Sequence, residues 1–127
     1  LGGHCSIEDN VVIGALAGVH QFCRVGRGAM IGGLSAVVAD VIPMGMVIGE
    51  RANLDGLNLI GLKRAGVNKD HINGLRAAFK MIFQSNNNVK DTIDPALDAY
   101  KGNPLVEEMI SFIKSETSRS LTISSKD

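Results

Sequence analysis

Side chains capable of acid-base chemistry and hydrogen bonding occur in a part of the chain that is otherwise rich in glycine and valine. His4 lies near the N-terminus, and His20 and Gln21 follow in the stretch GVHQFCRVGRGAMIGGLSAV, residues 18–37. A histidine can accept or donate a proton near neutral pH, and it can also bind a metal ion. Catalytic zinc usually takes three protein ligands, and the remaining histidine, His71, belongs to a later segment with helical spacing. Residue types alone leave substrate binding, proton transfer and a solvated surface as interpretations.

The composition bounds the fold and excludes classes of function. The 127 residues are 45% hydrophobic, with 13 Lys and Arg against 13 Asp and Glu, which suits one compact unit or two small ones. Nucleic-acid binding is not favoured, because a protein that follows phosphates needs surplus positive charge. No apolar run is long enough for a membrane span, so we expect a cytoplasmic protein without an integral membrane segment. Since Leu1 lies inside a patterned segment, we also expect a fragment of a longer chain.

The first part of the chain repeats every six residues. Each block begins with an aliphatic residue, and its fifth position is small or β-branched. A six-residue period fits neither a helix face nor an alternating strand, and it predicts a solenoid of short strands with three blocks, about 18 residues, per coil. Glycines after the aliphatic residue are expected to permit the tight corners. The first positions are Leu1, Ile7, Ile13, Val19, Val25, Ile31 and Val37, the fifth are Cys5, Val11, Ala17, Cys23, Ala29, Ser35 and Val41, and the corner glycines are Gly14, Gly26 and Gly32.

After Pro43 the six-residue period ends, and helical spacing follows a glycine-punctuated connector. Asn68 is a predicted N-cap for a helix that ends near residue 84. Pro95 predicts that a second helix starts only after Asp94, and Asn103 with Pro104 predicts a third start. The expected apolar faces are Ile72, Leu75, Phe79, Ile82 and Phe83, then Val89, Ile93, Leu97 and Tyr100, then Leu105, Met109, Phe112 and Ile113.

These patterns predict a β-solenoid followed by helices. We expect coils over residues 1–48, a connector loop over 49–67 and a small helical domain over 68–127, with no periodicity in the tail from Ser120. The helices are expected to pack on the last coil and to close one edge of the solenoid, since an open strand edge favours aggregation.

The repeat resembles that of the left-handed parallel β-helix acyltransferases, and the longer motifs narrow the resemblance. The segments GGHCSIEDN, GVHQFC, MIGGLSAV, GLNLIGLKRAG and INGLRAAFKMIFQS occur in this order. Together they resemble the C-terminal part of the acyl-carrier-protein:UDP-N-acetylglucosamine O-acyltransferases, which act first in lipid A synthesis. The resemblance implies transfer of a 3-hydroxyacyl chain from the phosphopantetheine thioester of acyl carrier protein to the sugar 3-hydroxyl. It implies a homotrimer with sites between subunits and no cofactor of its own.

The resemblance also implies roles for residues of the coils. Gly3 matches a glycine whose backbone N–H faces the thioester oxygen, and His4 matches a histidine that contacts substrate. His20 and Gln21 match a polar pair along the sugar and the pantetheine. Gly33 matches the position where side-chain bulk limits the length of the acyl chain.

Further roles follow for the second half of the chain. Asn58 and Arg64 match residues near the acyl chain or the nucleotide, where an arginine suits a phosphate. Ala65 stands where the family usually has a second arginine, and Ile60 replaces a usual acid, which puts phosphate affinity and one polar contact in doubt.

The resemblance also has implications for binding of the carrier protein and for the general base. Arg76 and Lys80, four residues apart, resemble basic positions that meet the acidic carrier protein, although a solvated helix face is the simpler interpretation. The histidine that deprotonates the sugar lies, in the family, about one coil before Gly3. We therefore expect the general base to be absent from this chain.

Two other functions stay open. A γ-type carbonic anhydrase resembles this architecture, yet only His4 and His20 lie in the repeats and no third ligand is evident, so no metal is expected. A trimeric scaffold without catalysis would keep the fold and bind neither substrate.

Overall fold

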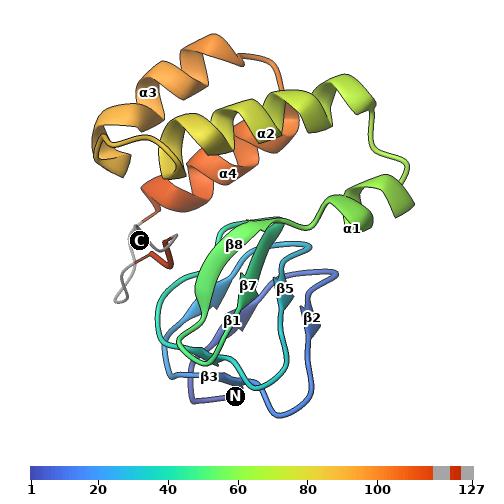
Figure 1. Ribbon diagram of the computed structural model, residues 1–127, viewed down its shortest axis with the longest axis vertical. Helices are drawn as coiled ribbons and strands as arrows, with labels where there is room; N and C mark the ends of the chain where they lie inside the picture. The colour runs from blue at the N-terminus through green and yellow to red at the C-terminus, as the bar shows by residue number, and fades with distance from the viewer. Residues whose placement is uncertain (116–120, 124–127) are drawn as a thin grey trace.

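A computed structural model describes residues 1–115 and 121–123, with short strands in the first half of the chain and helices in the second. In Figure 1 the strands form the lower layer and the helices lie above them. The strands are β1 Ser6–Ile7, β2 Val12–Ile13, β3 Gly18–Val19, β4 Arg24–Val25, β5 Met30–Ile31, β6 Ala36–Val37, β7 Gly45–Ile48 and β8 Asn53–Leu57. The helices are α1 Leu59–Arg64, α2 Lys69–Phe83, α3 Val89–Ala99 and α4 Pro104–Lys114.

The first six strands pair in parallel, each with the strand three blocks later. β1 pairs with β4, β2 with β5 and β3 with β6, and each pair forms its own face. Ser6 lies opposite Arg24 and Ile7 opposite Val25, so the predicted offset of three blocks is confirmed. β5 also pairs in parallel with β7, and β7 turns back into the antiparallel strand β8.

Most of the repeated apolar positions from Val19 onward lie in the hydrophobic core. Val19 is 3% exposed, and Val25, Ile31 and Val37 are fully buried, as predicted for the first position of each block. In the first coil Ile7 and Ile13 are each 36% exposed, because they have a neighbouring coil on one side only. The fifth positions Cys23, Ala29, Ser35 and Val41 are also buried.

The corner glycines are required by close approach of the neighbouring backbone. A Cβ on Gly14 would lie 2.5 Å from the backbone nitrogen of Gly33, and a Cβ on Gly26 would overlap Pro43. Positive φ angles occur instead at the fourth position of the first six blocks, in three cases at a leucine or phenylalanine, which rarely adopts them. The left-handed fourth positions are His4 (φ 57°), Asn10 (62°), Leu16 (59°), Phe22 (65°), Gly28 (70°) and Leu34 (63°).

Side-chain caps define the starts of the helices as predicted, with one exception. The Asn68 side chain accepts hydrogen bonds from the N–H groups of Asp70 and His71, and Asn103 caps α4 with Pro104 in its first turn. The prediction that the second helix starts only after Asp94 is wrong, because α3 begins at Val89 and contains Pro95.

The helix tolerates Pro95 for a physical reason. A proline leaves the carbonyl four residues earlier without its helical partner, and here that residue is Asp91. Asp91 and Pro95 both lie on the exposed side of α3, where water can bind the carbonyl, while Ile93 and Ala96 are buried on the other side.

Segment 49–67, expected as a connector loop, contains β8 and α1. The buried side chains of the strands and helices form one hydrophobic cluster, in which Leu62 of α1, Leu75 and Ile82 of α2 and Met109 of α4 are nearly inaccessible. In the described part of the chain, no helix is long and apolar enough to cross a membrane.

Candidate functional site

One corner of the stacked strands carries four of the predicted site residues, and we call it the histidine corner. It consists of residues 2–5 on the first coil and residues 19–22 on the next. The N–H of Phe22 donates to the carbonyl of Gly3 at 3.0 Å, and the Cys5 thiol donates to the carbonyl of His20 at 3.0 Å. These contacts bring together Gly3, His4, His20 and Gln21.

The side chains of the histidine corner face outward. His4, His20 and Gln21 are exposed, and the His4 ring stacks on Phe22 with ring centroids 5.2 Å apart and planes within 6°. A Cβ on Gly3 would meet no heavy atom within 4 Å, so a ligand can approach the backbone there. Imidazole and amide groups beside an accessible backbone can position a polar substrate.

A neighbouring corner shows what a backbone N–H at the position of Gly3 can bind. Arg27 holds the same third position in its block, and its N–H donates to the Glu8 carboxylate at 2.8 Å. The third-position N–H therefore points outward and can meet a negatively charged oxygen, as an oxyanion-binding group must. Among the described residues, the N–H of Gly3 itself has no such acceptor.

Gly33 lies on a second corner, away from the histidine corner. The N–H of the next residue, Leu34, donates to the carbonyl of Ala15 at 3.0 Å, and a Cβ on Gly33 would lie 3.2 Å from the same oxygen. This corner and the strands beside it form an apolar strip of exposed side chains: Val12, Leu16, Met30 and Leu34.

Asn58 lies at the third corner, where it is buried and holds α1 in place. Its Nδ2 donates to the carbonyl of Gly28 at 3.0 Å, and its Oδ1 accepts from the N–H of Gly61 at 3.1 Å. Arg64 is exposed at the end of the same helix, and Ile60 is 64% exposed near its start.

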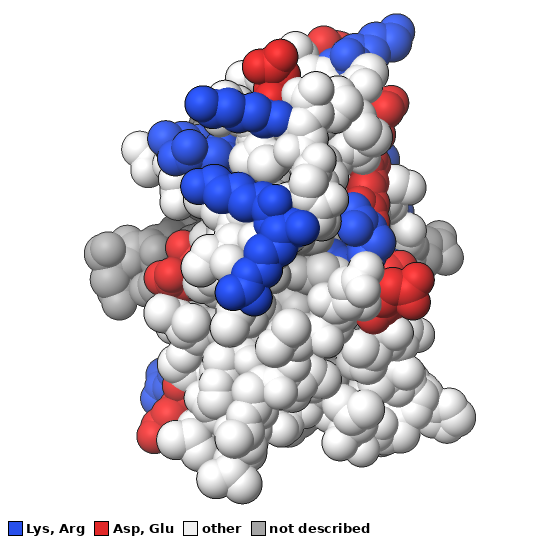
Figure 2. All heavy atoms as spheres, turned by 90° about the vertical axis from the view of Figure 1, so that its right-hand side faces the viewer, with Lys and Arg blue, Asp and Glu red and all other residues white. Residues whose placement is uncertain are grey.

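Arg76 and Lys80 are exposed on α2. Figure 2 shows Lys and Arg side chains gathered over the helical half of one face, while the strand half below is almost uncharged. The predicted carrier-protein residues belong to the helical layer, whereas Gly3, His4, His20, Gln21 and Gly33 belong to the coils.

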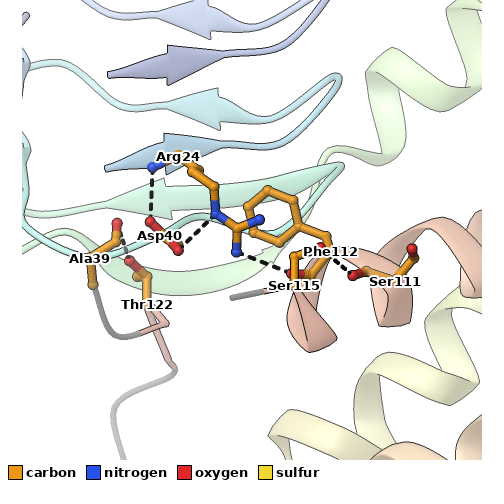
Figure 3. A network of polar contacts seen from close by, with 7 residues as sticks. All are labelled: Arg24, Ala39, Asp40, Ser111, Phe112, Ser115 and Thr122. Atoms are coloured by element: carbon orange, nitrogen blue, oxygen red, sulfur yellow. Dashed lines mark hydrogen bonds and ion pairs between the residues drawn. The ribbon is translucent and has the colours of Figure 1, made fainter. Parts of the chain in front are cut away.

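Arg24 joins the coils to the helices, because it forms an ion pair with buried Asp40 and also contacts Phe112 of α4, an arrangement that the sequence did not predict. The Asp40 carboxylate accepts from the backbone N–H of Arg24 at 2.8 Å and from its Nε at 3.0 Å. The same guanidinium donates to the Phe112 carbonyl at 3.1 Å and lies 4.2 Å from the centre of its ring (Figure 3). Thr122 closes the network, because its N–H and hydroxyl donate to the carbonyls of Asp40 and Ala39.

A second ion pair also joins the two layers. Arg27 donates from Nε and Nη2 to the two oxygens of Glu108, at 2.8 and 2.7 Å. The hydrogen bonds to Glu108 raise the pKa of Arg27 above its ordinary value, and partial burial opposes them. The only signal of either pair in the sequence is an arginine within the repeats, at position six or three of its block.

Several hollows among the described residues lie around the helices, including one of about 540 Å³ beside Asp70 and Tyr100. A cavity of about 470 Å³ is lined by Arg24, Ile93, Ile113 and neighbours, and another of about 430 Å³ by residues near Phe83. None of the three includes a residue of the histidine corner. Among the described residues, no three His, Cys, Asp or Glu side chains come together in a group that could hold a metal ion.

Stacked six-residue repeats with a polar outward corner and a helical region define a class of repeat proteins, and comparisons with known proteins identify the family. A family profile described as "Udp N-acetylglucosamine O-acyltransferase; Domain 2" matches residues 40–122. The acyl-[acyl-carrier-protein]–UDP-N-acetylglucosamine O-acyltransferase of Paracoccus denitrificans is 48% identical over 120 residues, which cover 94% of this chain and 45% of that protein.

Solved structures of acyltransferases also match this chain closely. The UDP-N-acetylglucosamine acyltransferase of Arabidopsis superposes with a TM-score of 0.90 at 37% identity, covering 98% of this chain and 46% of that one. The enzyme from Campylobacter jejuni gives 0.87 at 35% identity, covering 97% and 47%. The chain therefore belongs to the UDP-N-acetylglucosamine O-acyltransferase family, and it spans about half the length of the curated relatives it matches.

Proposed function

We propose that this chain is the C-terminal part of an acyltransferase that moves a 3-hydroxyacyl chain from acyl carrier protein to the 3-hydroxyl of UDP-N-acetylglucosamine, the first step of lipid A synthesis. The observation that carries the proposal is the histidine corner, where Gly3, His4, His20 and Gln21 lie on adjacent coils of a chain that belongs to this family. The proposed architecture is a left-handed parallel β-helix over residues 1–48, followed by the segment 49–67 and a helical domain over 68–127.

The proposed chemistry needs no cofactor beyond the phosphopantetheine of the donor. The N–H of Gly3 stabilises the negative charge that develops on the thioester oxygen. The side chains of His4, His20 and Gln21 hold the donor and the sugar in a reactive orientation. The general base that takes the proton of the sugar hydroxyl is proposed to lie outside this chain.

The remaining site residues bind other parts of the two substrates. Gly33 leaves room for the acyl chain beside the apolar strip, and Arg64 binds a phosphate of the nucleotide. Asn58 holds the start of α1, so its contribution near the ligand includes placing that helix. The exposed, positively charged side chains of Arg76 and Lys80 meet the acidic carrier protein, and the reaction is proposed to take place in the cytoplasm.

A homotrimer would complete the site. The histidine corner, Gly33 and Asn58 occupy three different corners of one chain, so one small ligand cannot touch all three without a second chain. A neighbouring copy that presents its apolar strip to the histidine corner would bring its Gly33 beside that corner and bury exposed Leu34 and Met30. Sedimentation should show a trimer, and a stable, folded monomer would refute this arrangement.

The activity test uses radiolabelled 3-hydroxyacyl carrier protein and UDP-N-acetylglucosamine. The chain as given should transfer no acyl group, and the same residues joined to preceding coils should be active, because a general base contributes about a hundredfold to ten-thousandfold in rate. Turnover by the chain alone that disappears in His4→Ala would assign the base to His4 instead. If neither substrate binds the longer protein, a non-catalytic scaffold is the better interpretation, and one zinc per chain would favour a carbonic anhydrase.

A further inference from the structure

Phe22 contacts the Gly3–His4 turn in two ways. Its ring is stacked in parallel on the imidazole of His4, with centroids 5.2 Å apart and planes within 6°. Its backbone N–H donates to the Gly3 carbonyl at 3.0 Å. Both aromatic residues have left-handed backbone angles, φ 57° for His4 and 65° for Phe22, so their side chains leave equivalent turns in the same direction.

This contact restrains a side chain that is otherwise free to rotate. His4 is exposed, and among the described residues neither of its ring nitrogens has a hydrogen-bond partner. An imidazole on the surface samples several ring orientations, since its terminal torsion is broad. Stacking on one face limits that rotation and leaves both nitrogens, which lie at the ring edge, open to a ligand.

The fold does not require an aromatic residue at this place. The equivalent pair on the second corner is Leu16 and Leu34, and on the third corner it is Asn10 and Gly28, all with positive φ. The Leu34 N–H makes the equivalent backbone hydrogen bond, to the carbonyl of Ala15 on the preceding coil, at 3.0 Å. Neither pair stacks two rings, so the turn forms without a stack and the aromatic pair needs another explanation.

We propose that Phe22 is a positioning residue, which fixes the plane of the His4 imidazole so that its ring edge faces the acyl donor and the sugar. This inference rests on the proposed function of the histidine corner. It adds a residue that touches no substrate itself and acts through His4.

The test measures acyl transfer by the full-length protein with Phe22→Leu, which keeps apolar bulk, and Phe22→Tyr, which keeps the ring. Phe22→Leu should lower kcat/KM by about two- to tenfold, the range expected for one aromatic stack. Phe22→Tyr should retain wild-type kcat/KM. Asn10→Ala is the matched control for a substitution in a left-handed corner, and it should leave kcat/KM unchanged.

A double-mutant cycle with His4→Ala separates positioning from a general effect on folding. If Phe22 acts through His4, Phe22→Leu should have no further effect on the residual rate of His4→Ala. An equal loss in both backgrounds, with wild type active, would overturn the inference and leave the proposed function intact. If wild type transfers no acyl group, the proposed function fails, and the assigned role of Phe22 in transfer fails with it.

An NMR measurement gives an answer that does not depend on turnover. In wild type the Phe22 ring should shift the carbon-bound protons of the His4 imidazole by its ring current, and Phe22→Leu should abolish this shift. Unchanged His4 resonances in Phe22→Leu would show that the stack is not formed in solution and would overturn the inference even if kcat/KM falls.

Discussion

Asp40 offers the sharpest test of how the coils and helices are held together. Its side chain is 1% exposed, and its carboxylate accepts two hydrogen bonds from Arg24. Asp40→Ala removes both bonds and, among the described residues, leaves the guanidinium in contact with Phe112. Breaking a buried pair from one side costs about 3–5 kcal/mol. Because the Arg24 side chain is 22% exposed and keeps its contacts with Phe112, we expect the lower end, about 3 kcal/mol.

A second variant separates the charge from the hydrogen bond. Asp40→Asn keeps an oxygen that can accept a hydrogen bond from the backbone N–H of Arg24. The free energy of unfolding should therefore fall by about 1–2 kcal/mol. Asp94→Asn is the matched control, since Asp94 pairs with Lys114 at 2.9 Å but the two side chains are 78% and 49% exposed. Exposed ion pairs contribute at most about 1 kcal/mol to the free energy of unfolding, so Asp94→Asn should have the smallest effect.

Denaturant unfolding of the purified full-length protein, followed by circular dichroism, measures these differences as shifts in midpoint at constant slope. The expected order of destabilisation is Asp40→Ala, then Asp40→Asn, then Asp94→Asn. If Asp40→Asn and Asp94→Asn unfold at the same denaturant concentration, the charge of Asp40 contributes nothing and the reasoning is refuted.

Three further predictions follow from the repeats and the second ion pair. In the complete enzyme Gly33→Met should shift the preference toward shorter acyl donors, because its Cβ meets the Ala15 carbonyl at 3.2 Å and the longer side chain extends outward; an unchanged chain-length profile would remove this role. Gly14→Ala should lower the unfolding midpoint more than Gly3→Ala, since only the first Cβ overlaps a neighbouring backbone, and equal midpoints would contradict this. The raised pKa of Arg27 means that its charge stabilises the fold fully at any pH below the ordinary arginine pKa, and that this contribution is lost only as the pH rises through the higher folded pKa. Loss of stability in Glu108→Gln should therefore be constant from pH 7 to 9, and a steep change there would refute it.

Much of the fold could be predicted because apolar residues recur every six positions in the first part of the sequence. The period of six places Val19, Val25, Ile31 and Val37 inside, and three blocks per coil fixes the pairing of β1 with β4, β2 with β5 and β3 with β6. The left-handed turns could not be predicted from residue types, since leucine and phenylalanine, at positions 16, 22 and 34, rarely adopt positive φ. Pairing with strands 18 residues away, which no local preference indicates, holds these turns in place.

For the helices, features that depend on nearby residues could be predicted, and contacts between residues far apart in the sequence could not. Asn68 and Asn103 act locally, on N–H groups two or three residues ahead, and both caps were predicted. The start of α3 was missed because Pro95 was weighed without knowing that Asp91 faces solvent. The contact of Arg24 with Phe112 joins residues 88 positions apart, so it depends on how the helices dock and leaves no pattern in the sequence.

The candidate site residues remain a prediction from the resemblance, and the repeat determines which of them lie close together. Residues that differ by one coil share a corner, which is why His4 lies beside Phe22 and near His20. Gly33 lies 18 residues after Ala15 and therefore belongs to another corner. The repeat that places His4 beside Phe22 thus also keeps Gly33 away from the histidine corner. A rigid stack cannot bend to bring its corners together. If all these residues serve one reaction, the missing surface must come from another chain, and the exposed apolar strip beside Gly33 is the part of this chain most suited to supply it.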